Sequence, residues 1–156
     1  MQPLGKFEVI SNKLIIADPA HNYDKRSEPS GKLPYIDVEN RIWYAYTTKS
    51  GKKIKELFVV TDPAIITECD DLTWEFETNI DVDTGQAGFF DLHHYRSDTS
   101  TSNYSLTSGF DIVNEGDKWY SMCCEITLNS KESAGVIPYG VVSNSGLGNG
   151  RYNVYV

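Results

Sequence analysis

Short apolar or alternating segments, separated by turn residues, follow one another along most of the chain. Residues 7–10 and 13–17 flank Ser11-Asn12, a two-residue turn signal, and this pattern predicts an opening hairpin. The aromatic and β-branched segment 41–48 is followed by a turn and by an apolar segment at 54–61. This arrangement predicts a second antiparallel pair.

Alternation continues in the second half of the chain. Leu72, Trp74 and Phe76 share one face of an extended segment, and Glu75 and Glu77 share the other. Further short apolar segments bounded by turn residues predict strands at 88–92, 134–137, 139–142 and 151–156. The last of these ends the chain and needs a pairing partner, because an unpaired terminal strand would fray.

Residues 119–128 fit either a helix or a strand, and the helical spacing of Trp119, Met122, Cys123 and Ile126 leads us to expect a short helix. Residues 19–34 and 97–108 are expected to be loops, because they are rich in turn and hydroxyl residues. Eight or nine strands with at most one or two short helices predict a mainly β fold. We expect a single-domain antiparallel β-sandwich or open barrel over residues 1–156.

Aromatic residues make up 12% of the chain, and most of the large ones are expected in the core with polar tips at its rim. The residues so assigned are Trp43, Tyr44, Tyr46, Trp74 and Trp119.

The composition is that of an ordinary globular domain, with 40% hydrophobic and 23% charged residues among 156. A domain of this length buries about two thirds of its unfolded surface, so it needs no metal or disulfide to fold. Cys69, Cys123 and Cys124 are an odd set with an adjacent pair, which indicates reduced thiols. No segment approaches the roughly 18 apolar residues of a membrane span. No signal-peptide core follows Met1, so we expect the mature protein to be the whole chain, in the cytoplasm. No cofactor is expected.

The net charge of −8 is unevenly distributed. Residues 1–60 hold 10 Lys and Arg against 7 Asp and Glu, a net of +3, whereas residues 61–156 hold 4 against 15, a net of −11. An acidic surface repels a phosphate backbone, which argues against direct binding of nucleic acid. It suits a basic partner, although solubility alone also accounts for an acidic surface.

Candidate ligand-binding residues occur in three clusters that couple polar side chains to sharp bends, at 18–21, 81–91 and 143–152. These candidates are Asp18, His21, Asp81, Asp83, Gln86, Asp91, Ser143, Ser145, Asn149 and Tyr152. We expect the β scaffold to gather the three clusters into one surface patch.

In the second cluster Asp81 and Asp83 project to the same side of an extended segment and could share a hard cation. No closing Glu follows, which excludes an EF-hand, and capping of a hairpin by Asx hydrogen bonds is the alternative.

In the third cluster Gly146 and Gly148 resemble the start of a dinucleotide-binding pattern, but no βαβ unit follows. Asn149-Gly150 is typical of a hairpin turn, and an anion-binding nest of backbone N–H groups is the alternative. His93 and His94 would point to opposite faces of a strand, so they are not expected to share an ion.

Three motifs of the chain resemble those of a family of small uncharacterised proteins from bacterial genomes and prophages, a domain of unknown function. Its motifs read Asp-Pro-Cys-Tyr, Val-Asp-Ser-Gly-Gln-Ala-Gly-x-Phe-Asp and Gly-Val-Val-Ser-Ser-Ser-Gly-Tyr-Gly-Asp-Gly-x-Tyr. Asp18-Pro19, residues 82–91 and residues 140–152 match them in order over nearly the whole chain. The resemblance implies a mainly β domain of mobile-element origin in a bacterial cytoplasm, and it implies no activity.

The chain departs from these motifs at several positions. Ala20-His21 replaces Cys-Tyr, and Thr84 replaces a serine. Asn149 replaces an aspartate, which removes one carboxylate from any shared metal site.

The expected function is a non-catalytic binding or inhibitory protein of phage or prophage origin. It would engage a protein or small ligand through its acidic face or glycine-rich loops, with no nucleic-acid or membrane partner. One alternative is a metal-assisted hydrolase of a phosphate ester or nucleotide, with Asp18, Asp83 and Asp91 as ligands and His21 or His93 as proton carrier. The other is a protein that sequesters a nucleotide within its glycine-rich loops.

Overall fold

The computed structural model describes residues 1–23, 33–66, 72–106 and 111–156. Cys69 and parts of the two expected loops lie outside these residues. Within the second expected loop, residues Asp98–Thr101 form a short 3-10 helix, η3.

A five-stranded antiparallel sheet forms the middle of the molecule. Its strands lie in the order β3 (Tyr35–Asp37), β2 (Lys13–Ala17), β7 (Gln86–Asp91), β9 (Gly140–Asn144) and β8 (Ala134–Ile137). The three inner strands supply its most buried residues, because both of their faces are covered.

The described residues also form two smaller antiparallel sheets. One contains β1 (Gln2–Glu8), β4 (Ile42–Ser50) and β5 (Lys53–Val60), and the other contains β6 (Phe76–Val82) and β10 (Gly150–Tyr155). The predicted β4–β5 hairpin is confirmed. The terminal strand β10 pairs with β6, which confirms the prediction that it has a pairing partner.

Two predicted hairpins are wrong. The chain at Ser11-Asn12 passes from β1 into a different sheet, because β2 already lies between β3 and β7 and has both edges occupied. The turn at Asn149-Gly150 likewise connects β9 of the central sheet to β10 of the two-stranded sheet. Turn chemistry predicts the position of a bend but not which strands pair across it.

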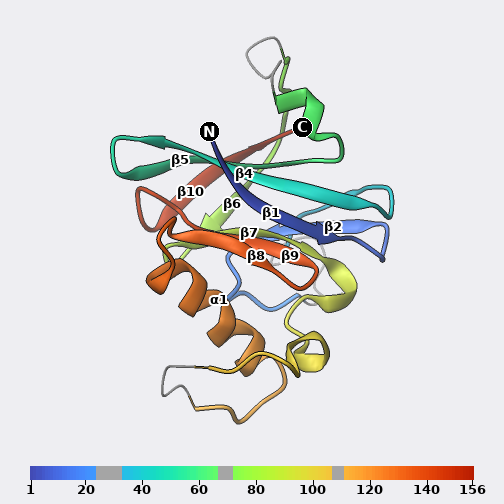
Figure 1. Ribbon diagram of the computed structural model, residues 1–156, viewed down its shortest axis with the longest axis vertical. Helices are drawn as coiled ribbons and strands as arrows, with labels where there is room; N and C mark the ends of the chain where they lie inside the picture. Colours follow the sequence, from blue (N-terminus) through green and yellow to red (C-terminus); the bar gives the residue numbers. More distant parts are fainter. Residues whose placement is uncertain (24–32, 67–71, 107–110) are drawn as a thin grey trace.

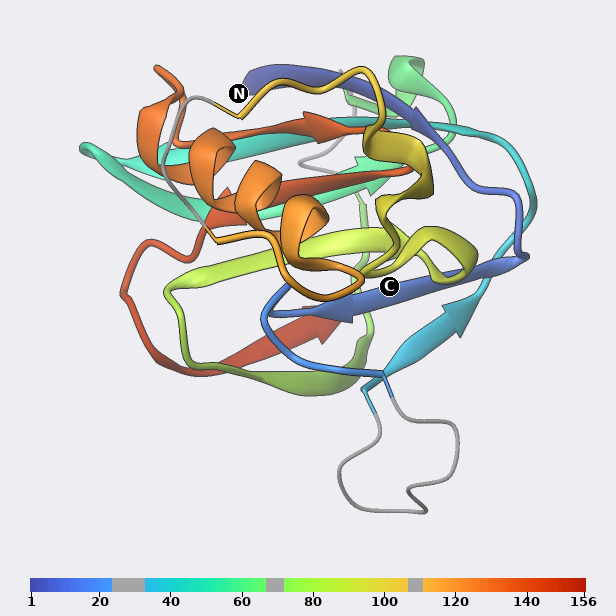
Figure 2. The same cartoon turned by 90° about the horizontal axis from the view of Figure 1, so that it is seen from below.

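The elements form layers, with the helix on one face of the central sheet and the smaller sheets on the other (Figures 1 and 2). The helix α1 (Asp117–Asn129) confirms the helical interpretation of residues 119–128. The described strands do not close into a barrel, and the predicted mainly β, sandwich-like class is confirmed. Among the described residues, no helix is long and apolar enough to cross a membrane.

Within the described parts of the chain, the core consists of three groups of buried side chains. Beneath α1, Trp119 contacts Phe90 with ring centroids 5.1 Å apart and Tyr95 with centroids 5.2 Å apart. On the opposite face of the central sheet, one group lies under the three-stranded sheet around Val9 and Ala45. The other lies under the two-stranded sheet around Ile80.

Candidate functional site

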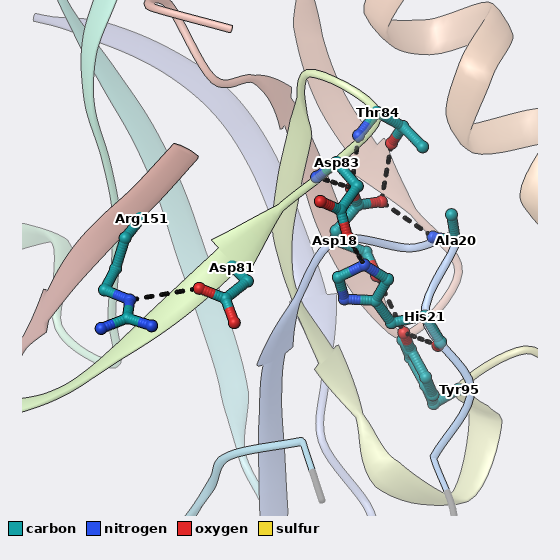
Figure 3. Close-up of polar contacts among 8 residues, drawn as sticks. All are labelled: Asp18, Ala20, His21, Asp81, Asp83, Thr84, Tyr95 and Arg151. Carbon is teal, nitrogen blue, oxygen red and sulfur yellow. Dashed lines mark hydrogen bonds and ion pairs between the residues drawn. The ribbon is translucent and has the colours of Figure 1, made fainter. Parts of the chain in front are cut away.

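Asp18 lies just after β2 and holds two bends of the chain together (Figure 3). Its carboxylate is fully buried, and one oxygen accepts hydrogen bonds from the backbone N–H groups of Asp83 and Thr84 at 2.9 and 2.7 Å. The other oxygen accepts from the Ala20 N–H at 2.9 Å and from the Thr84 hydroxyl at 2.7 Å. A buried carboxylate is stable only with such partners, so Asp18 organises this region rather than facing a ligand.

His21 lies at the outer side of the same region (Figure 3). Its Nε2 is 2.6 Å from the Oδ2 of Asp83, whose side chain is largely exposed. The hydroxyl of Tyr95 donates to the backbone carbonyls of Asp18 and His21 at 3.1 and 2.5 Å. Burial is the main cause that raises the pKa of Tyr95, so this phenol stays neutral and remains a donor.

The glycine-rich loop joins the same region through its backbone. The Ser145 N–H donates to the Gly85 carbonyl at 2.9 Å, and the Ser145 hydroxyl donates to the Gly148 carbonyl at 2.8 Å. The Tyr152 hydroxyl donates to the same Gly148 carbonyl at 2.7 Å. Residues 18–21, 83–85 and 145–148 therefore form one continuous region, which we call the bend cluster.

Several predicted site residues do not take part in the bend cluster. Asp81 lies apart from Asp18 and contacts Arg151 at 3.2 Å, so it shares no partner with Asp83 (Figure 3). Asn149 is exposed. The possible cation site shared by Asp81 and Asp83, to which hairpin capping was the alternative, is therefore not assembled.

Gln86 and Ser143 are buried, and their hydrogen bonds are internal. Gln86 accepts from the Thr127 hydroxyl at 3.0 Å and donates to the Cys124 sulfur at 3.4 Å, which ties β7 to α1. Ser143 donates to the Asn144 carbonyl at 2.8 Å. Both residues stabilise the packing of the fold instead of facing a ligand.

Asp91 lies at the opposite end of β7 from the bend cluster, because Leu14 pairs with Asp91 whereas Ala17 pairs with Gly88. Its buried carboxylate accepts from Ile10 N–H, from the N–H and hydroxyl of Ser11, and at 2.8 Å from Nδ1 of His94. Burial alone would raise the pKa of Asp91, but these hydrogen bonds together outweigh it and hold the pKa below its usual value.

The carboxylates expected for a metal-assisted hydrolase therefore do not converge. Asp18 and Asp83 lie at one end of β7, and Asp91 lies at the other. In the described part of the chain, no three His, Cys, Asp or Glu side chains gather around a point suited to a metal ion. Two surface hollows of the described residues lie outside the bend cluster, one beside Asn12 and Trp43 and one beside Lys13 and His93.

The prediction that His93 and His94 point to opposite faces is wrong. They lie in a 3-10 turn, η2 (Leu92–His94), instead of a strand, and their ring centroids are 5.0 Å apart. In a 3-10 turn successive side chains diverge by about 120°, whereas in a strand they point to opposite faces. Neighbouring rings in a 3-10 turn can therefore contact each other.

Sequence reasoning also missed a group of aromatic side chains at the surface, which we call the aromatic patch; Trp74, Phe76 and Tyr155 are exposed, and Tyr46 and Phe58 are half-buried. It contains Tyr46, Phe58, Trp74, Phe76 and Tyr155. Ring contacts link Tyr46 to Phe58 and Phe58 to Trp74, with centroids 5.5 and 6.5 Å apart. Phe76 contacts Tyr155 at 6.0 Å.

The expected core position of Trp74 is wrong, since 44% of this residue is exposed, and Phe76 and Tyr155 are 58% and 49% exposed. The inner face of the two-stranded sheet is filled further along by Ile80 and Val154, and Trp74 precedes the strand altogether. The sequence did contain one indication of this exposure: Trp74 and Phe76 lie in an acidic segment, and acidic neighbours indicate a solvent-exposed segment.

Comparison of the chain with protein-family models, with curated proteins and with solved structures finds no match.

Proposed function

We propose that the chain is a binding protein that acts without catalysis and that it holds a basic protein partner against the aromatic patch. The observation that carries this proposal is the exposure of Trp74, Phe76 and Tyr155, three large aromatic side chains on neighbouring segments. Exposed contiguous apolar surface is uncommon on soluble proteins and marks interaction sites. Aromatic residues of this kind supply much of the binding energy of protein interfaces.

The charge around the aromatic patch favours a basic partner. Glu56 is exposed and precedes Phe58 on the same face of β5. Glu75 and Glu77 are also exposed, but they lie on the opposite face of the extended segment from Phe76. The chain as a whole carries a net charge of −8. Complementary charge speeds association and excludes acidic competitors such as nucleic acids.

The buried carboxylates support a role without catalysis. Asp18 and Asp91 use both of their oxygens in internal hydrogen bonds, so neither is available as a general base or metal ligand. The resemblance of the bend motifs to bacterial and prophage proteins supports a setting in a bacterial cytoplasm, and it implies no activity.

The proposal is tested by comparing capture of proteins from bacterial lysate by three forms of the chain. These are the wild type, the double variant Trp74→Ser with Phe76→Ser, and the control Leu147→Ser. Leu147 is 79% exposed and lies in the glycine-rich loop, so the control removes an even more exposed apolar side chain elsewhere.

We expect a basic protein to be captured by the wild type and the control but lost with the double variant. The purified pair should bind at least about tenfold more weakly when the two aromatic residues are replaced. Its affinity should also fall as salt is raised. Equal binding by all three forms, or a captured partner that is acidic, would contradict the proposal.

A further inference from the structure

A pair of histidines stands at the end of β7 opposite the bend cluster, and the proposed function does not use it. His93 is exposed, and its ring lies at 82° to that of His94 with the centroids 5.0 Å apart. From this geometry we propose that His93 and His94 bind a late transition-metal ion that prefers imidazole, such as Cu²⁺ or Zn²⁺.

The orientation of His94 is fixed by Asp91. The Nδ1 of His94 lies 2.8 Å from one oxygen of the buried Asp91 carboxylate, and donors from Ile10 and Ser11 occupy the other oxygen. A carboxylate with these partners is an acceptor, so Nδ1 carries the proton and the lone pair of the neutral ring lies on Nε2. A carboxylate behind the imidazole is the usual support of a metal-bound histidine, and Asp91 is thus a positioning residue.

Tyr139 fixes the same ring from a second direction. Its ring stacks on that of His94 with centroids 3.6 Å apart and planes 2° apart. Tyr139 has a φ of +65°, a conformation that costs a side-chain-bearing residue free energy and persists where the surroundings hold it. The ring of His94 is therefore held in place before any ion binds.

A surface hollow of about 370 Å³ lies beside His93 and is lined also by Ser11, Lys13, Tyr23 and Leu92, which leaves room for water ligands on the His93 side of an ion. The Nζ of Lys13 forms an ion pair with Oδ1 of Asp37 at 2.6 Å, so its positive charge is offset and repels a bound cation less. A bound ion would lie about 2.0–2.1 Å from each imidazole nitrogen, which the proposal assigns to Nε2 of His94 and to a ring nitrogen of the exposed His93.

The chain contains a matched control. His21 is the third histidine of the sequence and also contacts a carboxylate, that of Asp83, at 2.6 Å. It lies at the other end of β7 and has no second histidine beside it, so it offers one nitrogen where the proposed site offers two.

The experiment is a calorimetric titration of the full chain with Cu²⁺, followed by electron paramagnetic resonance of the loaded protein. We expect one ion per chain and a nitrogen pattern from two imidazoles. His93→Gln and His94→Gln should each weaken binding at least about tenfold and remove one nitrogen, while His21→Gln should change neither. Asp91→Asn should weaken binding roughly ten- to hundredfold.

The outcomes separate the proposal from adventitious binding. Retained affinity in His93→Gln or His94→Gln, loss in His21→Gln, or coordination by the N-terminal amine would overturn the site. His93→Gln alters an exposed side chain, so its result holds even if Asp91→Asn fails to fold. Unchanged affinity in a folded Asp91→Asn variant would overturn the positioning role of Asp91.

Discussion

Asp18 illustrates how one acidic residue can be essential to a site without facing a ligand. Four hydrogen bonds converge on its buried carboxylate from Ala20, Asp83 and Thr84. Hydrogen bonds to a charged group contribute more than neutral ones, and the donors would be left unsatisfied without it. The half-buried His21 and the exposed Asp83 thus owe their positions to a residue that solvent does not reach.

We expect Asp18→Asn to lower the free energy of unfolding by on the order of 3 kcal/mol, because the amide nitrogen would face N–H donors. Urea denaturation followed by circular dichroism measures this change. Thr84→Val is the matched control, since it removes only the hydroxyl donor and should cost about 1 kcal/mol. A loss in Asp18→Asn no larger than that in Thr84→Val would contradict this account of the carboxylate.

At the residue scale the sequence predicted that Asp18, Asp83 and Ser145 lie close together. It did not predict which of their side chains are buried or which hydrogen bonds they form. Glycine and proline mark bends by local backbone preference, which a sequence displays directly. Whether a carboxylate beside a bend is buried depends on the strands around it. The same limit explains Trp74, whose two-residue alternation with Phe76 is compatible with either face of a sheet.

At the scale of elements, β7 depends on a glycine in its middle. A Cβ on Gly88 would lie 2.3 Å from the Val141 carbonyl oxygen and 2.4 Å from Cζ of Phe90. Both distances are far below van der Waals contact, and Val141 lies on the neighbouring strand β9. The close approach of β7 to its neighbour and to the Phe90 ring therefore requires a residue without a side chain.

We expect Gly88→Ala to destabilise the protein by several kcal/mol or to abolish soluble expression, because the strands must separate. Gly85→Ala is the comparison: its φ is +70° and nothing lies within 4 Å of an added Cβ. It should cost only about 1–2 kcal/mol, the cost of a left-handed conformation. Thermal unfolding of both variants measures the difference, and equal losses would refute the steric explanation.

Most elements could be predicted from local pattern, whereas their partners and ends could not. The spacing of Trp119, Met122 and Cys123 predicted α1, and all three are buried. The helix nevertheless begins at Asp117, because Asp98 accepts hydrogen bonds from the N–H groups of Gly116 and Trp119 at 3.0 and 2.9 Å. A cap supplied by a residue so distant in sequence leaves no local signal.

At the scale of the whole molecule, the pairing of β2 with β7 decides where the polar groups lie. It places the bend cluster at one end of the central sheet and the Asp91–His94 pair at the other. Strand order depends on contacts between distant segments, so composition and spacing could give the fold class but not this separation. The hydrolase alternative required a convergence that the strand order prevents.

Tyrosine hydroxyl groups around α1 make the stability of the whole molecule depend on pH in the alkaline range. Burial, followed by the Glu125 carboxylate that accepts from its hydroxyl at 2.7 Å, raises the pKa of Tyr104 to about 12. Burial, followed by Cys124, raises the pKa of Tyr120 to about 12. The pKa of Tyr95 is raised mainly by burial.

We expect the free energy of unfolding to be constant with respect to these groups below about pH 10, the pKa of an unfolded tyrosine, and to fall from there to about pH 12. The unfolded chain loses its phenol protons first, so rising pH draws the equilibrium toward it. Urea denaturation across this range, with absorbance at 295 nm to follow tyrosinate, measures both events. Tyr104→Phe should flatten the decline, while Tyr155→Phe, which alters an exposed ring of the aromatic patch, should leave it unchanged. A decline of equal slope in the wild type and in Tyr104→Phe would show that this phenol and its Glu125 partner do not couple the packing of α1 to pH.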